Sequence, residues 1–205
     1  MKYSDALELV KRYQIDFAEG IVVRNVEDAV KFAEYPVALK VVSDEILHKT
    51  DKGCVKLNIK DEQTLRKTYP EILLNAGQAK IDGILVQKMA KPGIELIIGG
   101  RKDEQFGPVI LFGLGGIFVE IFKDFSLRLC PIDRSDALEM ISEMKAYPLL
   151  TGARGRKPVD LEAIAGLLQK VSKLLWENKN IQELDLNPVI AYEKGCCAVD
   201  VRVLP

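Results

Sequence analysis

The chain has 205 residues, which is enough for one large domain or for two smaller ones that share a core. Apolar residues make up 48% and charged residues 29%, the balance of an ordinary folded protein rather than of a disordered one. The 29 basic and 30 acidic side chains leave a formal charge of −1, so net charge gives no argument for binding to nucleic acid. The chain lacks the run of about 18 apolar residues that a membrane span needs, and its first ten residues lack the apolar core of a signal peptide. We therefore expect a cytoplasmic protein that binds neither nucleic acid nor membrane.

The first part of the chain alternates between helical and strand-like patterns. Helices are expected over 4–13 and 25–34, each beginning at a residue that is favoured at helix N-caps. Strands are expected over 37–42 and 55–59. Pro70 interrupts the helical pattern that follows and should kink or split that helix.

From residue 82 the chain changes character. Five short strand-like runs, separated by Gly and Pro, lie at 83–89, 94–100, 108–114, 117–122 and 126–130. Helices are expected over 133–146 and 159–177, and the alternating runs at 183–192 and 197–204 are typical of a hairpin. This order of elements favours an α+β chain of two lobes, with a compositional boundary near residue 80.

The only histidine of the chain, His48, lies in a charged loop that follows an apolar strand. That strand contains Lys40, which has apolar neighbours on both sides and therefore either extends to water or meets an anion. The loop also holds Lys49, Lys52 and Gly53, a composition that suits a loop closing over phosphates, although it lacks the spacing of a Walker-type loop. A solvated turn explains the same composition, so both interpretations stay open here.

The two alternating runs near the end of the chain carry oxygen ligands. Asp185 and Asn187 are two residues apart on one expected strand, so both side chains emerge on one face. Asp200 lies on the partner strand of the expected hairpin and can come opposite them. Two carboxylates and an amide oxygen form a hard, all-oxygen set that suits Mg²⁺ bridging phosphates. The polar solvent face of an edge hairpin would account for the same residues.

A glycine-rich turn, FGLGGIFVE, lies between two apolar runs in the middle of the chain. Its glycines, Gly113, Gly115 and Gly116, are a weak signal for backbone that approaches a ligand closely. A tight turn explains them equally well.

These segments together resemble one known family, although none of them is specific alone. The matching stretches are 35–53, 83–129, 145–155 and 183–195. They resemble the β subunit of the ADP-forming acetyl-CoA synthetases, which are ATP-grasp proteins, and the likeness spans nearly the whole chain. The resemblance implies an ATP-grasp fold, an α+β class of two lobes with the nucleotide cleft between them. The first lobe is expected over 1–86, with the N-terminal helix and the His48 loop, and the second over 87–205, with the nucleotide hinge and the Mg²⁺-binding hairpin.

The resemblance also implies a reaction. Enzymes of this family convert an acyl-CoA, ADP and phosphate reversibly into a carboxylic acid, CoA and ATP. The β subunit is expected to need a CoA-binding α subunit, in a heterotetramer with two copies of each, and to accept a phosphoryl group from a histidine of that partner. His48 matches the histidine of the family motif I-L-H-K-[ST]-D and is implied to carry the phosphoryl group to ADP. A neutral imidazole is a competent nucleophile near neutral pH, which suits this role.

Further contacts to ATP or ADP and to Mg²⁺ are implied position by position. The nucleotide-binding set comprises Lys40, Lys49, Gln87, Lys88, Met89, Glu95 and Arg128, and the metal-binding set comprises Asp185, Asn187 and Asp200. Lys40 is expected at the phosphates, the backbone of 87–90 at the adenine and Glu95 at the ribose. Arg128 is expected at a phosphate, although a surface charge explains it equally well.

The chain departs from the family pattern at Cys54, where a second glycine is usual, and we expect its side chain to restrict the loop. Two other functions remain open at this point. The chain could be part of an ATP-grasp ligase that joins a carboxylate to an amine or thiol without using His48, or a non-catalytic module that binds nucleotide and regulates a partner. The sequence leaves the acyl group and the choice between ADP and GDP undecided.

Overall fold

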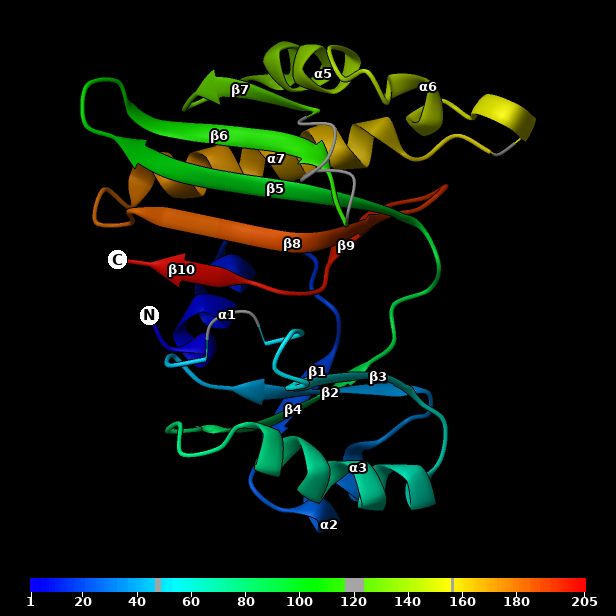
Figure 1. Cartoon of the computed structure of the whole chain (residues 1–205). Helices are drawn as coiled ribbons and strands as arrows, with labels where there is room; N and C mark the ends of the chain where they lie inside the picture. Colours follow the sequence, from blue (N-terminus) through cyan, green and yellow to red (C-terminus); the bar gives the residue numbers. More distant parts are fainter. Residues whose placement is uncertain (47–48, 117–123, 156) are drawn as a thin grey trace. The chain divides into compact units, whose positions relative to one another are not determined.

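A computed structural model of the chain describes residues 1–46, 49–116, 124–155 and 157–205 (Figure 1). The chain forms two compact units. The larger unit holds Met1, Tyr3–Phe17 and Pro92–Pro205, and the smaller one holds Lys2 and Ala18–Lys91. This division differs from the expected boundary between residues 86 and 87. The N-terminal helix belongs to the larger unit, and the chain passes from the smaller unit back into the larger one after residue 91.

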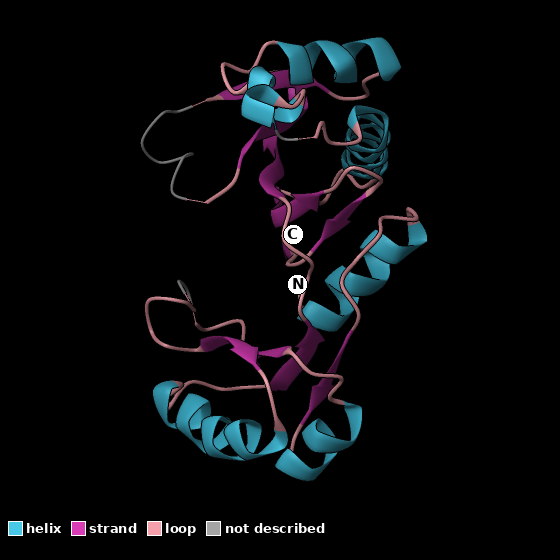
Figure 2. Cartoon of the chain, turned by 90° about the vertical axis from the view of Figure 1, so that its right-hand side faces the viewer, coloured by secondary structure: helices cyan, strands magenta, loops and turns pink. Residues whose placement is uncertain are grey.

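The smaller unit is a four-stranded antiparallel sheet with two helices on one face (Figure 2). Its elements are β1 (Gly20–Val23), α2 (Val26–Phe32), β2 (Val37–Val42), β3 (Val55–Ile59), α3 (Glu62–Asn75) and β4 (Gly83–Lys88). The strand order is β1-β4-β2-β3, so that β2 and β4 are central. Leu39 of β2 and Val86 of β4, which are paired, are fully buried in the core with Leu65 and Ile72 of α3. Alternate residues of the central strands therefore anchor the helices.

The helix α3 begins at Asp61, whose side chain accepts a hydrogen bond from Thr64 N, and continues through Pro70 to Asn75. The expected split at Pro70 is therefore wrong, and the expected kink stays a prediction. A proline removes one hydrogen bond from a helix interior. Burial of Leu65 and Ile72 against the sheet stabilises the helix as a whole.

The larger unit is built on a second antiparallel sheet, with strand order β10-β8-β5-β6-β7 and with β9 beside β8. Its elements are α1 (Tyr3–Arg12), β5 (Ile94–Asp103), β6 (Gly107–Leu114), β7 (Phe125–Leu129), α5 (Arg134–Ser142), α6 (Tyr147–Leu150), the 3₁₀ turn η1 (Ala153–Gly155), α7 (Leu161–Glu177), β8 (Glu183–Ala191), β9 (Cys196–Ala198) and β10 (Arg202–Leu204). Most of these elements were expected. The elements α6 and η1 were not, the expected strand at 197–204 is divided into β9 and β10, and the expected strand at 117–122 falls outside the described residues. The antiparallel sheet and the two α+β units confirm the expected fold class.

The two faces of the larger sheet have different surroundings. A Cβ atom at Gly100 of β5 would lie 2.2 Å from Leu175 Cδ1 of α7, so this residue faces the helix. The neighbouring Gly99 therefore belongs to the opposite face. Strand pairing places Gly99 in one row with Asp185 on one side and with Leu111 and then Leu127 on the other. We call the face toward α7 the helix face and the face defined by this row the pocket face.

The helix α1 joins the larger unit through contacts with distant parts of the sequence. The amino group of Met1 donates a hydrogen bond to Val203 O at 3.2 Å. The hydroxyl of Tyr13 donates to Glu177 Oε2 at 2.7 Å, at the end of α7. Every helix in the described ranges is too short or too polar to cross a lipid bilayer.

Candidate functional site

The hairpin at the end of the chain brings the three expected metal ligands together in the larger unit. Opposite Ile97 of β5, the strand β8 contributes two residues, Asn187 and Pro188, where a regular ladder has one. Such a bulge redirects a side chain and is common beside active sites. The expected strand at 197–204 is divided into β9 and β10, and Asp200 lies in the break between them. Because β9 and β10 pair with β8 on either side of the bulge, Asp200 comes opposite this part of β8, as expected for the hairpin.

The electrostatic setting of Asp185 suits a divalent cation. Burial raises the pKa of its carboxyl group to about 6; the carboxylates of Glu183 and Asp200 act in the same direction, and the guanidinium of Arg202 opposes them. A metal ion beside such a group replaces the proton that burial and like charge would otherwise retain. The set of two carboxylates and an amide oxygen matches the hard ligands that Mg²⁺ prefers, so these residues fit the ion. Within the described ranges, no group of three or more His, Cys, Asp or Glu side chains could hold a metal, which leaves this mixed set as the candidate.

In the smaller unit, Lys40 lies at the middle of the central strand β2 and is only 7% exposed. Its neighbours Leu39 and Val41 belong to the core beneath the helices, so Lys40 extends from the opposite face of the sheet. Gln87 of β4 pairs with Ala38 and extends from that same face, diagonally next to Lys40. This face therefore carries a buried ammonium group, which suits an anionic ligand, and a buried amide whose Nε2 donates a hydrogen bond to Ala18 O at 3.2 Å.

The segment expected to face the adenine, 87–90, begins at the end of β4. The side chain of Lys88 lies on the other face of the sheet from Gln87, where its Nζ is 2.7 Å from Glu19 Oε2 and 2.9 Å from Glu34 Oε2. The backbone N–H of Lys88 donates to Glu19 O and that of Met89 to Pro36 O. The structure thus gives the Lys88 side chain an ion-pairing role. Recognition of a base by this segment would have to use its carbonyl oxygens or an N–H beyond Met89.

The loop of His48 is held at both ends. His48 itself lies outside the described residues, so its role stays a prediction. Before it, Ile46 is buried in the core of the smaller unit. After it, the half-buried Lys49 accepts a hydrogen bond from Cys54 N at 2.8 Å. The contact of Lys49 with nucleotide stays a prediction.

The turn that closes this loop explains the departure at Cys54. Gly53 has a φ of +67°, and its carbonyl accepts a hydrogen bond from Asn75 Nδ2 at 2.9 Å. Cys54 is fully buried in the core. Of the described residues other than glycine, only Gln14 and Asn58 have a positive φ. Cys54 therefore adopts a backbone conformation that does not require glycine. The expected restriction of the loop by its side chain stays a prediction.

The glycine-rich turn lies against Glu95, the residue expected near the ribose. The N–H of Gly115 donates to Glu95 O at 2.8 Å, and a Cβ atom on Gly115 would lie 3.0 Å from Glu95 C. Gly116 has a φ of +68°, and a Cβ atom there would lie 3.2 Å from Glu95 Oε2. These glycines therefore let the turn pack closely on an exposed carboxylate of the larger unit.

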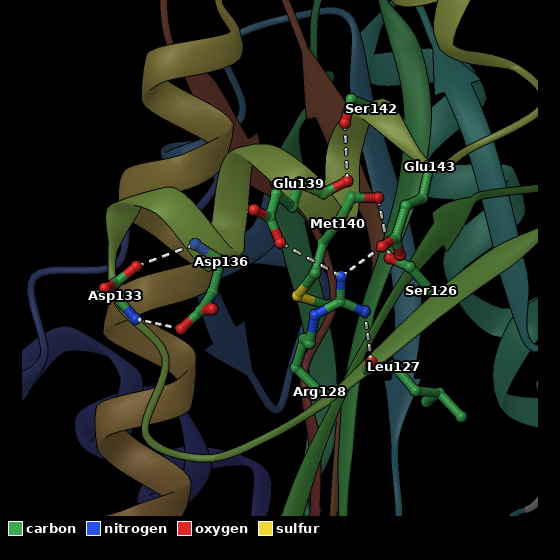
Figure 3. Close-up of polar contacts among 9 residues, drawn as sticks. All are labelled: Ser126, Leu127, Arg128, Asp133, Asp136, Glu139, Met140, Ser142 and Glu143. Atoms are coloured by element: carbon green, nitrogen blue, oxygen red, sulfur yellow. Dashed lines mark hydrogen bonds and ion pairs between the residues drawn. The ribbon is translucent and has the colours of Figure 1, made fainter.

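Arg128 is not brought to the metal-ligand set. Strand pairing through Ile110 and Gly100 places it on the helix face, whereas Asp185 belongs to the pocket face. Its guanidinium is hydrogen-bonded to the carboxylate of Glu143, which raises the pKa of Arg128, and also donates to Leu127 O at 2.9 Å (Figure 3). Of the two interpretations of Arg128, the structure supports the ion pair rather than a phosphate contact.

A comparison with known proteins bears on these features. The family model described as an ATP-grasp domain matches residues 1–204. The chain belongs to the ATP-grasp family. Within this family it belongs with the ADP-forming acetate–CoA ligases, because the β subunit of acetate–CoA ligase (ADP-forming) I of Pyrococcus furiosus is 49% identical over 98% of this chain and 89% of its own length.

Two further relatives of this ATP-grasp chain show how the domain occurs elsewhere. Acetate–CoA ligase (ADP-forming) I of Archaeoglobus fulgidus is 48% identical over 98% of this chain, but the match covers only 30% of that protein. Acetyl-coenzyme A synthetase 1 of Ca. Korarchaeum cryptofilum, solved with coenzyme A and Ca-AMPCP, is 46% identical and superimposes with a TM-score of 0.95 over 100% of this chain and 92% of that one. A second structure of that enzyme, with Mg-AMPPCP and a phosphohistidine segment pointing toward the nucleotide site, has a TM-score of 0.86 at 46% identity over 100% and 91% of the two chains.

One feature of this ATP-grasp chain was not expected from its sequence, namely a pocket on the larger sheet beside Asp185. Its floor includes Gly99, the first of two adjacent glycines in the middle of β5. Glycine is unfavourable inside a strand and often marks a place where something approaches the backbone closely. The pair Gly99–Gly100 was therefore the signal that could have indicated the pocket.

Proposed function

We propose that this chain is the nucleotide-binding subunit of an ADP-forming acyl-CoA synthetase, and that it transfers a phosphoryl group to ADP. The observation that carries the proposal is the position of Asp185, Asn187 and Asp200 around one bulge of a hairpin, with the pKa of Asp185 raised by burial and, secondarily, by the carboxylates of Glu183 and Asp200. The similarity to an enzyme that was solved with Mg-AMPPCP supports the same assignment.

The transfer that we propose has two steps. In the first, an imidazole nitrogen of His48 attacks the phosphorus of a phosphohistidine on the partner subunit; the P–N bond to the partner's histidine breaks as a P–N bond to His48 forms. In the second, a terminal phosphate oxygen of ADP attacks the phosphorus on His48, which releases the imidazole and forms the new O–P bond of ATP. Both steps are reversible, because the phosphoramidate and the phosphoanhydride are both energy-rich.

The residues of the chain have distinct roles in this proposal. Asp185, Asn187 and Asp200 would hold Mg²⁺, which supplies charge neutralisation at the phosphates of the nucleotide. Lys40 provides a buried ammonium group for the phosphates, and burial makes that charge more effective than it would be in water. Glu95, with the glycine turn packed on it, offers a carboxylate to the ribose hydroxyls.

The proposal includes a partner. The similarity to a protein named as a β subunit supports a second, CoA-binding α subunit that supplies the phosphoryl group. The proposed assembly has two copies of each subunit. The acyl group would then be chosen by the partner, so that acetyl-CoA is the first substrate to assay.

The direct test is to mix the purified chain with its CoA-binding partner and to measure ATP formed from acetyl-CoA, ADP and phosphate. ATP should form only when both subunits are present. His48→Asn should abolish ATP formation and leave Mg-ADP affinity within about twofold, because the histidine carries the phosphoryl group rather than the nucleotide. Full activity of the chain without a partner would contradict the proposal.

The same variant separates the alternatives. Unchanged turnover in His48→Asn would favour an ATP-grasp ligase that forms an acyl phosphate directly. A non-catalytic nucleotide-binding module would acquire no acid-labile label from ATP labelled in its γ-phosphate. The proposed subunit should acquire that label in the wild type and lose it in His48→Asn.

A further inference from the structure

The first helix of the chain, α1, buries a hydroxyl group that has no partner among the described residues. Tyr3 opens this helix and is only 9% exposed, and its hydroxyl oxygen forms no hydrogen bond with any residue in the described ranges. It lies on the buried face of the helix with Ala6 and Val10. A phenylalanine could pack there equally well and would leave no polar group without a partner. The buried hydroxyl therefore indicates a function other than packing.

The chain on either side of α1 is hydrogen-bonded to the segment that carries Asp200. Before the helix, the amino group of Met1 donates to Val203 O at 3.2 Å. After it, the carbonyl oxygen of Asp16 accepts a hydrogen bond from Ala198 N at 2.9 Å. Asp200 lies between these two attachment points, in the break between β9 and β10, and belongs with α1 to the larger unit (Figure 1). The helix is therefore held beside the stretch of chain that contains this proposed metal ligand.

The hydroxyl of Tyr3 is close enough to Asp200 to be affected by its charge. Burial raises the pKa of this hydroxyl, and the carboxylate of Asp200 raises it further. The phenol therefore stays protonated at neutral pH and can donate a hydrogen bond to a carboxylate. Among the hydrogen bonds of the described residues, the carboxylate of Asp200 accepts one, from Val201 N to Oδ1 at 2.9 Å. Since an ionised carboxylate can accept about four, Asp200 can accept one from Tyr3 as well.

We propose that Tyr3 is a positioning residue of the metal site, and that its hydroxyl donates a hydrogen bond to the carboxylate of Asp200 when that carboxylate holds Mg²⁺. This inference rests on the proposed function and deepens it, since it adds a residue to the same site. Groups that hydrogen-bond to a metal-binding side chain fix its orientation, and their loss commonly lowers metal affinity by about 10- to 100-fold. In the metal-free chain the hydroxyl is buried without that hydrogen bond. It therefore serves the bound state and not the fold.

The test removes only the hydroxyl, by Tyr3→Phe, and measures the affinity for Mg-ADP by calorimetry together with the melting temperature of the metal-free chain. Mg-ADP affinity should fall about tenfold, whereas ADP affinity in EDTA should change less than about twofold. The melting temperature of the metal-free chain should be unchanged or higher, because the variant loses a buried hydroxyl that had no partner. A packing role would not give a loss of Mg²⁺-dependent affinity together with unchanged or greater stability.

Tyr13, directly after α1, offers a matched control. Its hydroxyl donates to Glu177 Oε2 at 2.7 Å and accepts a hydrogen bond from Asn178 Nδ2 at 2.9 Å. Tyr13→Phe makes the same chemical change where the hydroxyl already has partners in the fold. It should therefore show the opposite pattern: a lower melting temperature of the metal-free chain, and an Mg-ADP affinity within about twofold of the wild type.

A third variant, Asp200→Asn, keeps the two proposals apart. If it weakens Mg-ADP binding and Tyr3→Phe does not, the inference is overturned and the proposed function survives. If Tyr3→Phe lowers the melting temperature and weakens ADP binding equally with and without Mg²⁺, the role of Tyr3 is structural and the inference is again overturned. If Asp200→Asn binds Mg-ADP like the wild type, the metal site is wrong and both proposals fail. If Tyr3→Phe gives the expected loss but the wild type forms no ATP with the partner, the inference stands and the proposed function fails.

Discussion

At the scale of single residues, Asp185 is the group whose chemistry is most altered by its surroundings. Its pKa is raised to about 6, so the folded chain without metal binds a proton at this carboxyl more tightly than the unfolded chain does. The sign follows directly: the free energy of unfolding of the metal-free chain falls as the pH rises from about 4 through about 6. A bound Mg²⁺ would compete with that proton.

We therefore expect Mg²⁺-dependent ADP affinity to decrease as the pH falls through about 6, because protonation of Asp185 removes a ligand. Asp185→Asn should abolish the Mg²⁺-dependent part of the affinity and raise the melting temperature of the metal-free chain at about pH 8. Calorimetry and thermal unfolding at several pH values measure both effects. Glu104→Gln, a charge removal in the exposed turn between β5 and β6, should do neither; a similar response there would show a general charge effect instead.

Arg128 gives a second prediction at this scale. Its guanidinium is hydrogen-bonded to the carboxylate of Glu143, which joins α5 to the outer strand β7, and it donates a second hydrogen bond to the carbonyl oxygen of Leu127 (Figure 3). Arg128→Met should lower the free energy of unfolding by about 0.5–1.5 kcal/mol and leave Mg-ADP affinity unchanged. Denaturant unfolding and calorimetry make this comparison. If the variant folds like the wild type but loses affinity for Mg-ADP, the result would support a contact between Arg128 and a phosphate of the nucleotide.

At the scale of elements, the start of α7 is tied to the hairpin that carries the proposed metal ligands. The carboxylate of Asp160 accepts hydrogen bonds from Ala163 N at 3.0 Å, as an N-cap, and from Gly195 N at 2.9 Å, in the turn between β8 and β9. Its backbone N–H donates to Tyr192 O at 2.8 Å. One side chain therefore fixes the helix relative to the hairpin.

Asp160→Ala should lower the free energy of unfolding by about 1–3 kcal/mol, since it removes the cap and leaves Gly195 N without its acceptor. Asp160→Asn should cost less, because an amide oxygen can still cap the helix. The same two hydrogen bonds lower the pKa of Asp160, so its contribution is lost as acid protonates it below its ordinary range. Denaturant unfolding of the two variants checks the order; equal losses would mean that the turn contact matters more than the cap.

Much of the element order could be predicted from the sequence, because periodicity and capping are local signals. The strand around Lys40 and the hairpin with Asp185, Asn187 and Asp200 are examples. What could not be predicted depends on partners far along the chain. The apolar residues of β7 alternate as an ordinary strand would, and nothing local shows that Arg128 rather than Leu127 turns toward the helices. Likewise, the helical pattern of α1 does not show that its partners lie at Val203 and Glu177.

At the scale of the whole molecule, the bound nucleotide should contribute to stability. A ligand at about 100 times its dissociation constant adds about 2.7 kcal/mol to the free energy of unfolding of the protein that binds it. Mg-ADP should therefore raise the melting temperature by several degrees, and EDTA should reverse most of that rise. A scan of the chain with ADP, with Mg-ADP and with Mg-ADP plus EDTA measures the shift, and an equal shift with and without Mg²⁺ would argue against the metal site.

Because α1 belongs with the C-terminal elements, the smaller unit is an insertion in the larger one, entered after Phe17 and left after Lys91. During synthesis on the ribosome, residues 18–91 emerge as a continuous stretch and can assemble before translation ends. The larger unit cannot assemble in this way. Its first helix, α1, lacks its native partner Val203 until β10 has been synthesised. Because the chain is synthesised from its N-terminus, the larger unit, which holds the proposed metal ligands, is the last to be completed.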